Sequence, residues 1–311
     1  MSGPVPAPET VAVAVVTFNR ADLLVGMLEA LAAQVHRPDA VIVLDNASTD
    51  HTARVLATST LPGLQVITSE TNVGGAGGFH RVVRAAHEQG FDRIWLMDDD
   101  VAPAPDCLAV LMATDEDCLM AVREDRHGAL VEKAALRFDL TDPRAIKPKT
   151  AMVETTYGTR AAMPERVEIE VVAFEGFMVR RGVVDRVGLP DPSYFIFYDD
   201  VDFALRARAA GYRIWAVRDA VLVRRLDFDQ QHDLAGWKGY YMYRNLFVVH
   251  RRYGTNALVR HKPYAVAAAV TLLSPLRGGR AEARNVLRAL RDSRSMGTLV
   301  SEAEPRVPPR R

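Results

Sequence analysis

Three consecutive carboxylates, Asp98-Asp99-Asp100, follow the apolar run Ile94-Trp95-Leu96. Side chains packed this closely repel one another unless a divalent cation with a preference for oxygen ligands, such as Mg²⁺ or Mn²⁺, shares them. If residues 93–97 form a strand of an open α/β sheet, the triplet lies outside its carboxyl end, where such sheets bind ligands. A solvated acidic turn would explain an isolated triplet as well, so the rest of the chain must decide between the two.

A glycine-rich segment, residues 72–79, reads Asn-Val-Gly-Gly-Ala-Gly-Gly-Phe. Four glycines let backbone N–H groups approach an anion at the start of a helix, which indicates phosphate recognition. A dinucleotide-binding fingerprint should follow the first strand with the spacing G-x-G-x-x-G, whereas this segment follows the third. A Walker loop is excluded because it needs Gly-Lys-Ser/Thr and the segment has no Lys.

A second acidic cluster, Tyr198-Asp199-Asp200-Val201-Asp202, opens an expected helix that ends at Gly211. Acidic side chains suit the positive end of a helix dipole, so capping could account for one of these carboxylates. Capping does not require three, and we therefore treat the cluster as a second candidate site.

Strands and helices that alternate at short intervals must position these groups. Expected strands cover residues 11–17, 41–44, 64–68, 93–97, 167–174 and 212–217. Expected helices start at Asp22, at Ser48 or Thr49 and at Gly77, and shorter ones cover about 106–113 and 183–187. The alternation predicts right-handed βαβ units and a mostly parallel sheet. The irregular, proline-containing stretch 124–165 is a candidate lid over the site.

The C-terminal part of the chain is aromatic and then basic. A helix over 234–252 would place Trp237, Tyr241 and Arg244 on one face, although core packing explains about half of the aromatic residues here. From Arg244 onward there are fourteen Lys or Arg and only four Asp or Glu. Arginines recur every three or four residues over 277–294, which predicts a basic amphipathic helix. Its basic face could be solvated or could lie on anionic lipid headgroups.

Composition limits the protein class. The chain has 311 residues, 49% hydrophobic and 25% charged, so it can fold as one large domain or two modest ones. Zero net charge argues against a polyanion binder, and no nucleic-acid partner is expected. The two cysteines, Cys107 and Cys118, predict neither a disulfide scaffold nor a zinc cluster. With no secretory signal and no apolar run near the roughly 20 residues of a spanning helix, we expect a cytoplasmic protein that touches a membrane peripherally.

Five stretches together resemble the family 2 glycosyltransferases of the GT-A fold, over residues 11–253. They are Thr17-Phe18-Asn19-Arg20, the Asp-Asn-Ala-Ser-Thr-Asp segment 45–50, the glycine-rich segment 72–79, the triplet 98–100, and 198–203 followed by Arg206 and Gly211. Within the family, the glycine-rich segment, the Asp-Asp-Val-Asp motif and residues 226–253 are most similar to the galactofuranosyltransferases that begin mycobacterial cell-wall galactan.

The resemblance implies an α/β domain with a nucleotide-binding sheet and a C-terminal helical, membrane-proximal extension. It implies a donor half at 11–123, an acceptor half at 166–253 and a basic helical region at 254–300. We expect disordered tails at 1–10 and 301–311.

The resemblance also assigns roles to residues. It implies that the UDP-sugar donor is bound by Thr17, Asn19, Arg20, Asp45, Asn72, Gly74, Gly75, Asp98 and Asp99. Mn²⁺ or Mg²⁺ would bind Asp98 and Asp100, and Asp200, beside Asp199, would be the general base for an inverting displacement. No Ser-His-Asp or Cys-His arrangement competes for that role. Trp237, Tyr241 and Arg244 would contact the acceptor.

The activity that the resemblance implies is transfer of galactofuranose from UDP-galactofuranose. The expected acceptor is the rhamnose of a polyprenyl-diphosphate-linked rhamnosyl-GlcNAc at the cytoplasmic face of the plasma membrane, and a homo-oligomer is left open. The alternatives are a rhamnosyltransferase using dTDP-rhamnose, a sugar nucleotidyltransferase and a catalytically silent membrane-binding module. A nucleotidyltransferase should carry a glycine-rich loop with an Arg after the first strand, where this chain has Thr-Phe-Asn-Arg.

One position departs from the pattern. Related galactofuranosyltransferases are expected to place a metal-binding His where this chain reads Val223-Arg224-Arg225. Arg cannot ligate a cation. Three explanations stay open: His232 reaches the metal, water completes its shell, or Arg224 contacts the diphosphate.

Overall fold

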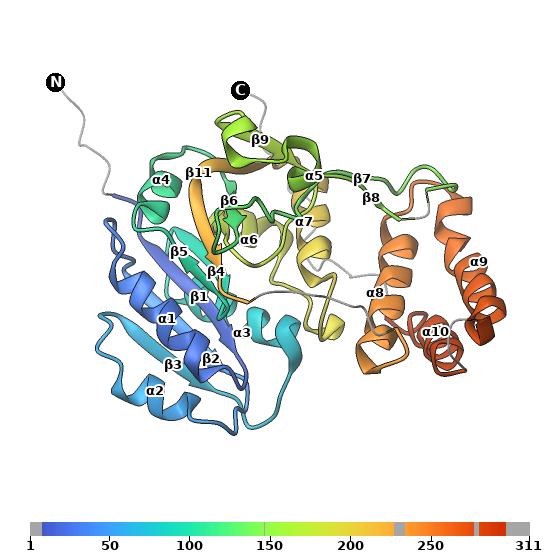
Figure 1. The fold of residues 1–311 in the computed structure, drawn as a ribbon, viewed down its shortest axis with the longest axis horizontal. Coiled ribbons are helices and arrows are strands. Elements are labelled where there is room, and N and C mark those ends of the chain that lie inside the picture. Colours follow the sequence, from blue (N-terminus) through green and yellow to red (C-terminus); the bar gives the residue numbers. More distant parts are fainter. Residues whose placement is uncertain (1–7, 146, 227–233, 277–279, 297–311) are drawn as a thin grey trace.

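The first half of the chain forms the predicted alternation of parallel strands and helices (Figure 1). The structure is a computed structural model that describes residues 8–145, 147–226, 234–276 and 280–296. The elements of this half are β1 (Val11–Thr17), α1 (Ala21–Ala32), β2 (Ala40–Asp45), α2 (Thr52–Thr58), β3 (Leu64–Thr68), α3 (Gly74–Glu88) and β4 (Arg93–Asp98). β1 lies between β2 and β4, and these three strands are buried almost throughout, which is why they read as continuous apolar runs.

Beyond β4 the sheet is mixed. The further elements are β5 (Val101–Pro103), α4 (Cys107–Ala113), β6 (Cys118–Glu124), β9 (Arg166–Ile169), β10 (Phe177–Arg180), α6 (Arg181–Val187), η2 (Pro192–Tyr194), α7 (Asp199–Ala209) and β11 (Ile214–Arg224). The strand order of the nine-stranded sheet is β3-β2-β1-β4-β10-β6-β11-β5, with β9 paired to β11. β10 is antiparallel to both of its neighbours, so parallel pairing is confirmed for β1 to β4 and for β6 with β11.

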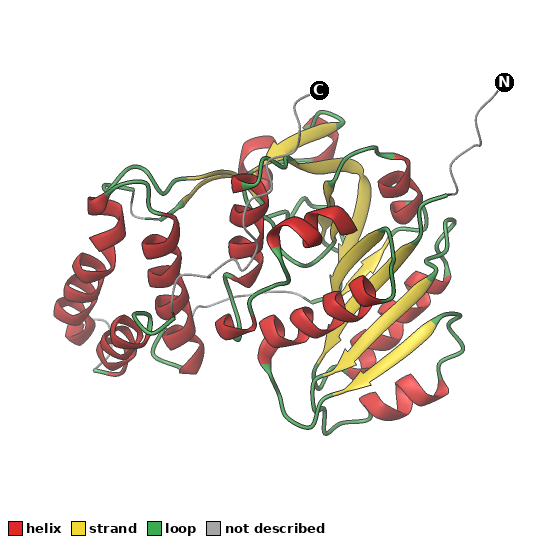
Figure 2. Cartoon of the chain, turned by 180° about the vertical axis from the view of Figure 1, so that it is seen from behind, coloured by secondary structure: helices red, strands yellow, loops and turns green. Residues whose placement is uncertain are grey.

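Helices cover both faces of the sheet (Figures 1 and 2). On one face α1, α2 and α4 pack against the odd-numbered side chains of β1, with Leu24 and Met27 fully buried. On the other face α3, α6 and α7 pack against Ala12 and Ala14, with Phe79 of α3 in the same cluster. Burial on both faces fixes the strand ends, and therefore the groups that follow them, in a rigid frame.

Several expected boundaries are wrong. α1 begins at Ala21 with no side-chain cap from Asp22, and α2 begins at Thr52, after both Ser48 and Thr49. α3 begins at Gly74 rather than Gly77, so its first turn is made of the glycine-rich segment itself. The strand expected over 167–174 ends at Ile169, and the short strands β5, β6 and β10 were not predicted.

Residues 124–165 are more ordered than predicted. They contain a hairpin of β7 (Ala135–Phe138) and β8 (Lys149–Met152), then α5 (Val153–Tyr157) and η1 (Arg160–Ala162). Phe138, Val153 and Met163 join the main hydrophobic core. The prediction of an irregular stretch is therefore wrong, and its role as a lid stays a prediction.

A helical lobe lies beside the sheet and consists of α8 (Trp237–Tyr253), α9 (Ala257–Leu273), η3 (Ser274–Leu276) and α10 (Ala281–Asp292) (Figure 1). α10 is the predicted basic helix, and α9 lies within the predicted helical region 254–300 but was not predicted as a separate helix. One face of α8 packs into the lobe through Tyr243 and Phe247, and another joins the main core through Val248 and Val249. α8 therefore connects the lobe rigidly to the sheet.

The predicted division into a domain over 11–253 and a basic region over 254–300 stays a prediction. In the structure α8 packs with both parts. Residues 1–7 and the predicted tail 301–311 lie outside the described residues. Among the described helices, none has the length and apolar character needed to cross a membrane.

Candidate active site

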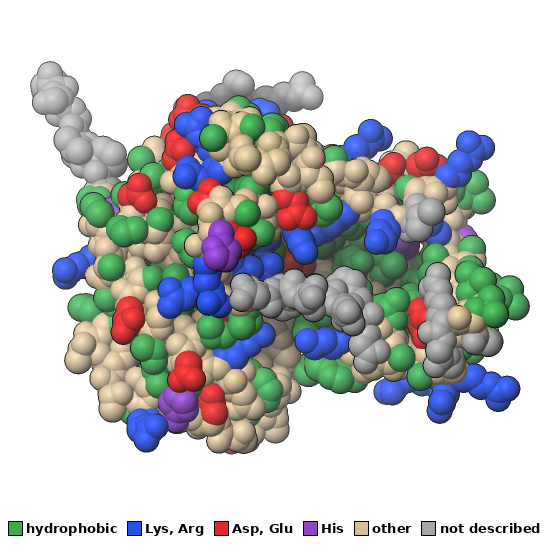
Figure 3. All heavy atoms as spheres, in the orientation of Figure 1, with side chains coloured by type: hydrophobic (Ala, Val, Ile, Leu, Met, Phe, Trp, Pro, Cys, Tyr) green, Lys and Arg blue, Asp and Glu red, His purple; other side chains and the backbone are tan. Residues whose placement is uncertain are grey.

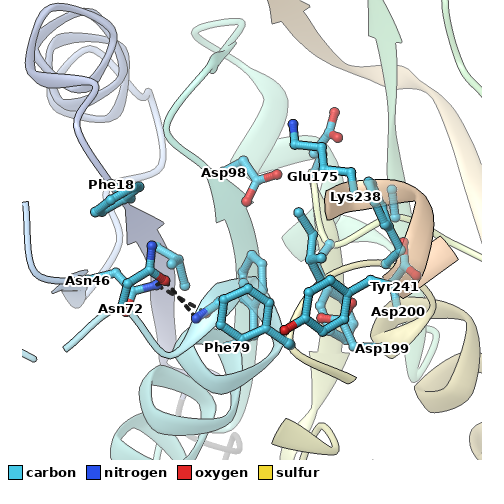
Figure 4. Close-up of a pocket in the computed structure, with 18 of the residues that line it drawn as sticks. Phe18, Asn46, Asn72, Phe79, Asp98, Glu175, Asp199, Asp200, Lys238 and Tyr241 are labelled. Atoms are coloured by element: carbon cyan, nitrogen blue, oxygen red, sulfur yellow. Dashed lines mark hydrogen bonds between the residues drawn. The ribbon is translucent and has the colours of Figure 1, made fainter. Parts of the chain in front are cut away.

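A cavity of about 920 Å³ opens at the carboxyl ends of β1, β2 and β4 and reaches α8 and α10. It brings together most of the residues predicted from the sequence, as Figure 4 shows in part. Those that line it are Thr17, Arg20, Asn72, Gly74, Gly75, Asp98, Asp99, Asp100, Asp199, Asp200, Trp237 and Tyr241. Because the carboxyl ends of parallel strands meet at one edge of a sheet, motifs far apart in the chain converge here.

The acidic triplet is a buried, hydrogen-bonded group and not a solvated turn. Asp99 and Asp100 are 2% and 3% exposed. Asp99 accepts hydrogen bonds from the Thr17 hydroxyl at 2.7 Å and from Arg20 Nη1 at 3.0 Å. Arg20 Nη1 also donates to Asp100 Oδ2 at 3.1 Å. Thr17 and Arg20 therefore orient the triplet, and Asp99 is committed to them.

Asp98 and Asp100 keep the capacity to bind a cation. Asp100 Oδ1 is buried and has no hydrogen-bond partner among the described residues. Burial, with Glu175 adding to it, raises the pKa of Asp100 to about 6 and raises that of Asp98 well above its usual range. A divalent cation that binds buried carboxylates with raised pKa values stabilises their ionised form. The donor set therefore fits a hard cation such as Mg²⁺ or Mn²⁺.

The side chains that the structure describes do not form a complete cage for that cation. Within the described residues no group of three or more His, Cys, Asp or Glu side chains is arranged to hold a metal ion. His232 lies outside those residues. The remaining ligands of a cation on Asp98 and Asp100 would therefore come from outside the described side chains.

Glu175 is a charged residue of the cavity that the sequence analysis missed. It pairs with Arg123, which Glu132 also holds through Nε at 3.0 Å and Nη2 at 2.9 Å. It pairs as well with Arg224 Nη2 at 3.7 Å. Burial would raise the pKa of Glu175, but Arg123 and Arg224 together lower it, so Glu175 is an anion. Arg224, at the end of β11, thus lines the cavity as an ion-paired cation.

The glycine-rich segment is fixed between the two halves of the molecule. Gly74 has φ +74°, and a Cβ on it would lie 2.1 Å from the carbonyl oxygen of Phe195. Asn72 Oδ1 accepts from Gly74 N at 2.8 Å and from Asn46 Nδ2 at 3.1 Å. A Cβ on Gly75, in contrast, would meet nothing within 4 Å. Gly74 therefore serves a close backbone contact, and Gly75 faces the open cavity.

The loop that presents Asp199 and Asp200 has an unusual backbone. Phe195, Phe197 and Tyr198 all have positive φ, at 63°, 67° and 67°. Non-glycine residues adopt this conformation at a cost of about 1–3 kcal/mol each, so the surrounding structure must hold them. The buried Asn245 of α8 does so, because its Nδ2 lies within hydrogen-bond distance of the carbonyl oxygens of Tyr194, Ile196 and Phe197, at 3.0, 2.7 and 2.9 Å.

The carboxylates of the second cluster have different surroundings. Asp202 is fully buried and accepts hydrogen bonds from the hydroxyls of Tyr194 and Tyr253 and from Arg206 and Arg252. It is a structural residue. Asp199 and Asp200 face the cavity, and burial raises the pKa of each. For Asp200 the positive charge of Lys149, on β8, partly offsets this effect.

We expect Asn245→Ala to lower the free energy of unfolding by about 1–3 kcal/mol and to lower kcat, because the carbonyls of Ile196 and Phe197 lose the Asn245 amide as a donor and the loop loses its support. Urea unfolding and initial-rate kinetics measure the two effects. Asn256→Ala is the matched control, since Asn256 caps α9 away from the cavity by accepting from Val259 N at 3.0 Å. It should lower stability by about 1 kcal/mol without changing kcat. A less stable Asn245→Ala enzyme with unchanged kcat would show that Asn245 does not position the loop.

Three predicted site residues do not line the cavity. Asn19 Oδ1 accepts from Thr49 N at 2.7 Å, and Asp45 Oδ1 accepts from Ser48 N at 2.9 Å, so both brace the loop after β2. Arg244 Nη2 donates to the carbonyl oxygens of Ser193 and Tyr194, both at 2.8 Å.

Other residues line the cavity without having been predicted. They include Asn46, Phe79, Glu175, Phe195, Lys238, Tyr240, Asn285 and Arg288. Asn46 and Lys238 each adjoin a predicted residue, a signal that could have found them. Glu175 is a single carboxylate outside any acidic cluster, and Arg288 is one of many arginines on its helix, so neither was distinguished by its neighbours in the sequence.

Comparisons with known proteins agree with this geometry. A family model described as glycosyltransferase like family 2 matches residues 7–245. Galactofuranosyltransferase GlfT1 of Mycobacterium tuberculosis (strain H37Rv) is 30% identical over 225 residues, which cover 71% of this chain and 72% of that protein. GlfT1 of Mycolicibacterium smegmatis is 31% identical over 206 residues, 65% of this chain and 67% of that one. GlfT2 of the same organism is 27% identical over 79% of this chain, which spans only 42% of GlfT2.

Solved structures share the fold. Mannosyltransferase PcManGT from Pyrobaculum calidifontis, in complex with GDP-Man and Mn²⁺, superposes with TM-score 0.53 at 21% identity, covering 94% of this chain and 79% of that one. GalNAc-T7, solved with UDP, GalNAc and Mn²⁺, gives TM-score 0.61 at 13% identity, covering 93% of this chain and 55% of that one. These likenesses confirm the predicted GT-A architecture.

Proposed function

We propose, on the premise that this chain belongs to the glycosyltransferase family 2, that it is an inverting, metal-dependent galactofuranosyltransferase that uses UDP-galactofuranose. The acceptor we propose is the rhamnose of a polyprenyl-diphosphate-linked rhamnosyl-GlcNAc, so that the product begins cell-wall galactan. The observation that carries the proposal is one cavity lined by Asp98, Asp100 and the glycine-rich segment as well as by Asp199 and Asp200. Figure 4 labels Asp98, Asp199 and Asp200 around it. Relatives named galactofuranosyltransferases support the choice of sugar.

The donor occupies the side of the cavity nearest β1 and β2. Thr17, Arg20, Asn72, Gly74, Gly75 and Asp99 shape its nucleotide site, with Asn46 added from the structure. Asn19 and Asp45 do not line that site but support it, because they accept hydrogen bonds from the backbone N–H groups of residues 48–50. Asp98 and Asp100 would hold Mn²⁺ or Mg²⁺, and such a cation would supply positive charge to stabilise the departing diphosphate.

Asp200 acts as the general base. Its carboxylate takes the proton of the acceptor hydroxyl while that oxygen bonds to the anomeric carbon and the bond to UDP breaks on the opposite face. One displacement of this kind inverts the anomeric configuration. A pKa raised by burial suits the role, because a base works best when its pKa lies near the working pH. Asp199, one residue earlier, contacts the same region.

The helical lobe fits an anionic membrane surface at the cytoplasmic face of the membrane. Its exposed apolar side chains include Leu272, Leu273 and Leu276, which are 77%, 44% and 84% exposed. Figure 3 shows hydrophobic side chains at the outer end of the lobe with Lys and Arg beside them. Apolar side chains flanked by arginines favour binding at an interface of anionic lipids. Such binding would bring the cavity to a lipid-linked acceptor.

The function is tested with purified protein and a synthetic rhamnosyl-GlcNAc lipid diphosphate. UDP-galactofuranose, UDP-galactopyranose and dTDP-rhamnose are supplied in parallel, and products are identified by mass and linkage analysis. We expect transfer from UDP-galactofuranose alone. Transfer from dTDP-rhamnose alone would replace our proposal with a rhamnosyltransferase.

A further inference from the structure

We infer that Lys238 and Arg288 form an anion-binding subsite for the diphosphate of the lipid-linked acceptor. Lys238 lies in the first turn of α8 and Arg288 lies on α10, and both line the cavity on the wall made by the helical lobe. The inference rests on the proposed function for the identity of the ligand. The sequence analysis chose Arg244 as the cation that contacts the acceptor, and the inference gives that contact to Lys238 and Arg288 instead.

Negatively and positively charged side chains line different walls of the cavity. All of its lining carboxylates come from the sheet side, namely Asp98, Asp99, Asp100, Glu175, Asp199 and Asp200. The cations of that side are already paired: Arg20 with Asp99 and Asp100, and Arg224 with Glu175. On the wall formed by α8 and α10 the charged lining residues are Lys238 and Arg288, both cations. An anionic group in the cavity therefore meets a net positive wall only at this end.

Arg288 is held in place by an ion pair with Asp292, a partner that it shares with other donors. Its guanidinium lies 4.6 Å from the centroid of the Tyr240 ring. Its Nε lies 3.5 Å from Asp292 Oδ2, but Asp292 also accepts from Arg291 Nε at 2.7 Å and from the Tyr240 hydroxyl at 2.9 Å. The Arg288 side chain is 65% exposed, so its N–H groups can reach a ligand. A guanidinium presents several donors in a fixed plane, which suits the oxygens of a diphosphate.

An aromatic cluster lies beside these cations, with Lys238 Nζ 5.7 Å from the centroid of the Trp237 ring. The rings of Phe195 and Tyr241 stack with centroids 4.9 Å apart, and the Trp237 ring meets Tyr241 edge-on at 6.0 Å. Figure 4 shows Lys238 and Tyr241 on the side of the cavity away from Phe18 and Asn72. Exposed aromatic faces give an acceptor sugar a surface to pack on. A sugar there, with its reacting hydroxyl toward Asp200, would direct a diphosphate on its other end toward Lys238 and Arg288.

Arg284 provides a matched control. It lies one turn before Arg288 on α10, is exposed, and is not among the residues that line the cavity. Arg288→Gln and Lys238→Gln remove one positive charge each and keep most of the side-chain length. Arg284→Gln makes the same change in charge on the same helix, outside the cavity.

The test compares two acceptors that carry the same sugars, one on a prenyl diphosphate and one on a neutral octyl group. Loss of one charge-assisted contact should raise KM for the diphosphate acceptor about tenfold in Arg288→Gln and in Lys238→Gln. KM for the octyl glycoside and the affinity for UDP should not change, and Arg284→Gln should match the wild type in all three. Equal effects on both acceptors, weaker UDP binding, or no effect at all would each overturn the inference.

A direct binding measurement separates this inference from the proposed function. Farnesyl diphosphate is titrated into the wild type and the three variants by calorimetry, with no sugar donor present. We expect about tenfold weaker binding in Arg288→Gln and Lys238→Gln only. If the wild type transfers no galactofuranose but shows this binding pattern, the subsite stands and the proposed function fails. If transfer occurs and farnesyl diphosphate binds all four proteins equally, the subsite is refuted and the function stands.

Discussion

Replacing Asp200 with Asn is expected to lower kcat about a thousandfold and to leave the affinity for UDP unchanged. Asn has nearly the shape of Asp, but it cannot accept the proton of the acceptor hydroxyl. Positioned acid–base groups contribute about 10²- to 10⁴-fold to rates, which sets the expected size. Initial rates with saturating donor and acceptor, together with a calorimetric titration of UDP, measure both quantities.

Asp199→Asn is the comparison that assigns the base. Asp199 lies in the same first turn of α7 and lines the same cavity. We expect a smaller loss of kcat from it, since it changes the electrostatic surroundings of Asp200 without removing the proton acceptor. A thousandfold loss in Asp199→Asn, with Asp200→Asn nearly as active as the wild type, would move the assignment to Asp199.

The pH profile gives an independent check on the base. Burial raises the pKa of Asp200, and the base must be deprotonated to act. The wild-type rate should therefore fall as the pH decreases through that raised pKa, and the residual rate of Asp200→Asn should lack this limb.

The donor side of the site could be predicted because its residues follow consecutive strands. Asp45 is the last residue of β2, and Asp98 is the last residue of β4. Parallel strands carry their carboxyl ends to one edge, so strand prediction alone brings these groups together. Their fine placement could not be predicted, because it depends on turns: Asp45 bonds to Ser48 N and leaves Asn46 to line the cavity.

The acceptor side depends on contacts between distant segments. Glu175 becomes a site residue only through Arg123 and Arg224, 52 and 49 positions away in the chain. Arg284 and Arg288 lie one turn apart on the same side of α10. Which of them reaches the cavity depends on how α10 packs on α8 through Val286 and Tyr243. Neither the place of Glu175 nor that of Arg288 in the cavity can be recognised from the residues next to it in the sequence. The sequence analysis chose Arg244 because its spacing from Trp237 and Tyr241 is regular, but the structure commits Arg244 to backbone carbonyls.

Removal of divalent cations is expected to abolish transfer, and added Mn²⁺ or Mg²⁺ should restore it. Asp98→Asn should lower kcat/KM by about a hundredfold or more, because charge stabilisation of this kind is worth several kcal/mol. Asp98 is the carboxylate of the triplet that neither Thr17 nor Arg20 contacts by a hydrogen bond in the described structure. EDTA treatment followed by titration with each cation checks the requirement, and calorimetric titration of Mn²⁺ in the presence of UDP checks the site without relying on activity.

Asp99→Asn tests whether the two roles within the triplet are distinct. Asp99 is occupied by Thr17 and Arg20, so its loss should disturb folding and the position of Arg20 more than it weakens Mn²⁺ binding. Asp98→Asn should show the opposite pattern, with weaker Mn²⁺ binding and a stability near that of the wild type, because burial of the Asp98 charge is itself unfavourable. If both variants bind Mn²⁺ as the wild type does, Asp98 is not a ligand of the cation. The metal assignment would then fail for Asp98, and the pairing of Asp99 and Asp100 with Arg20 would remain as their role in the triplet.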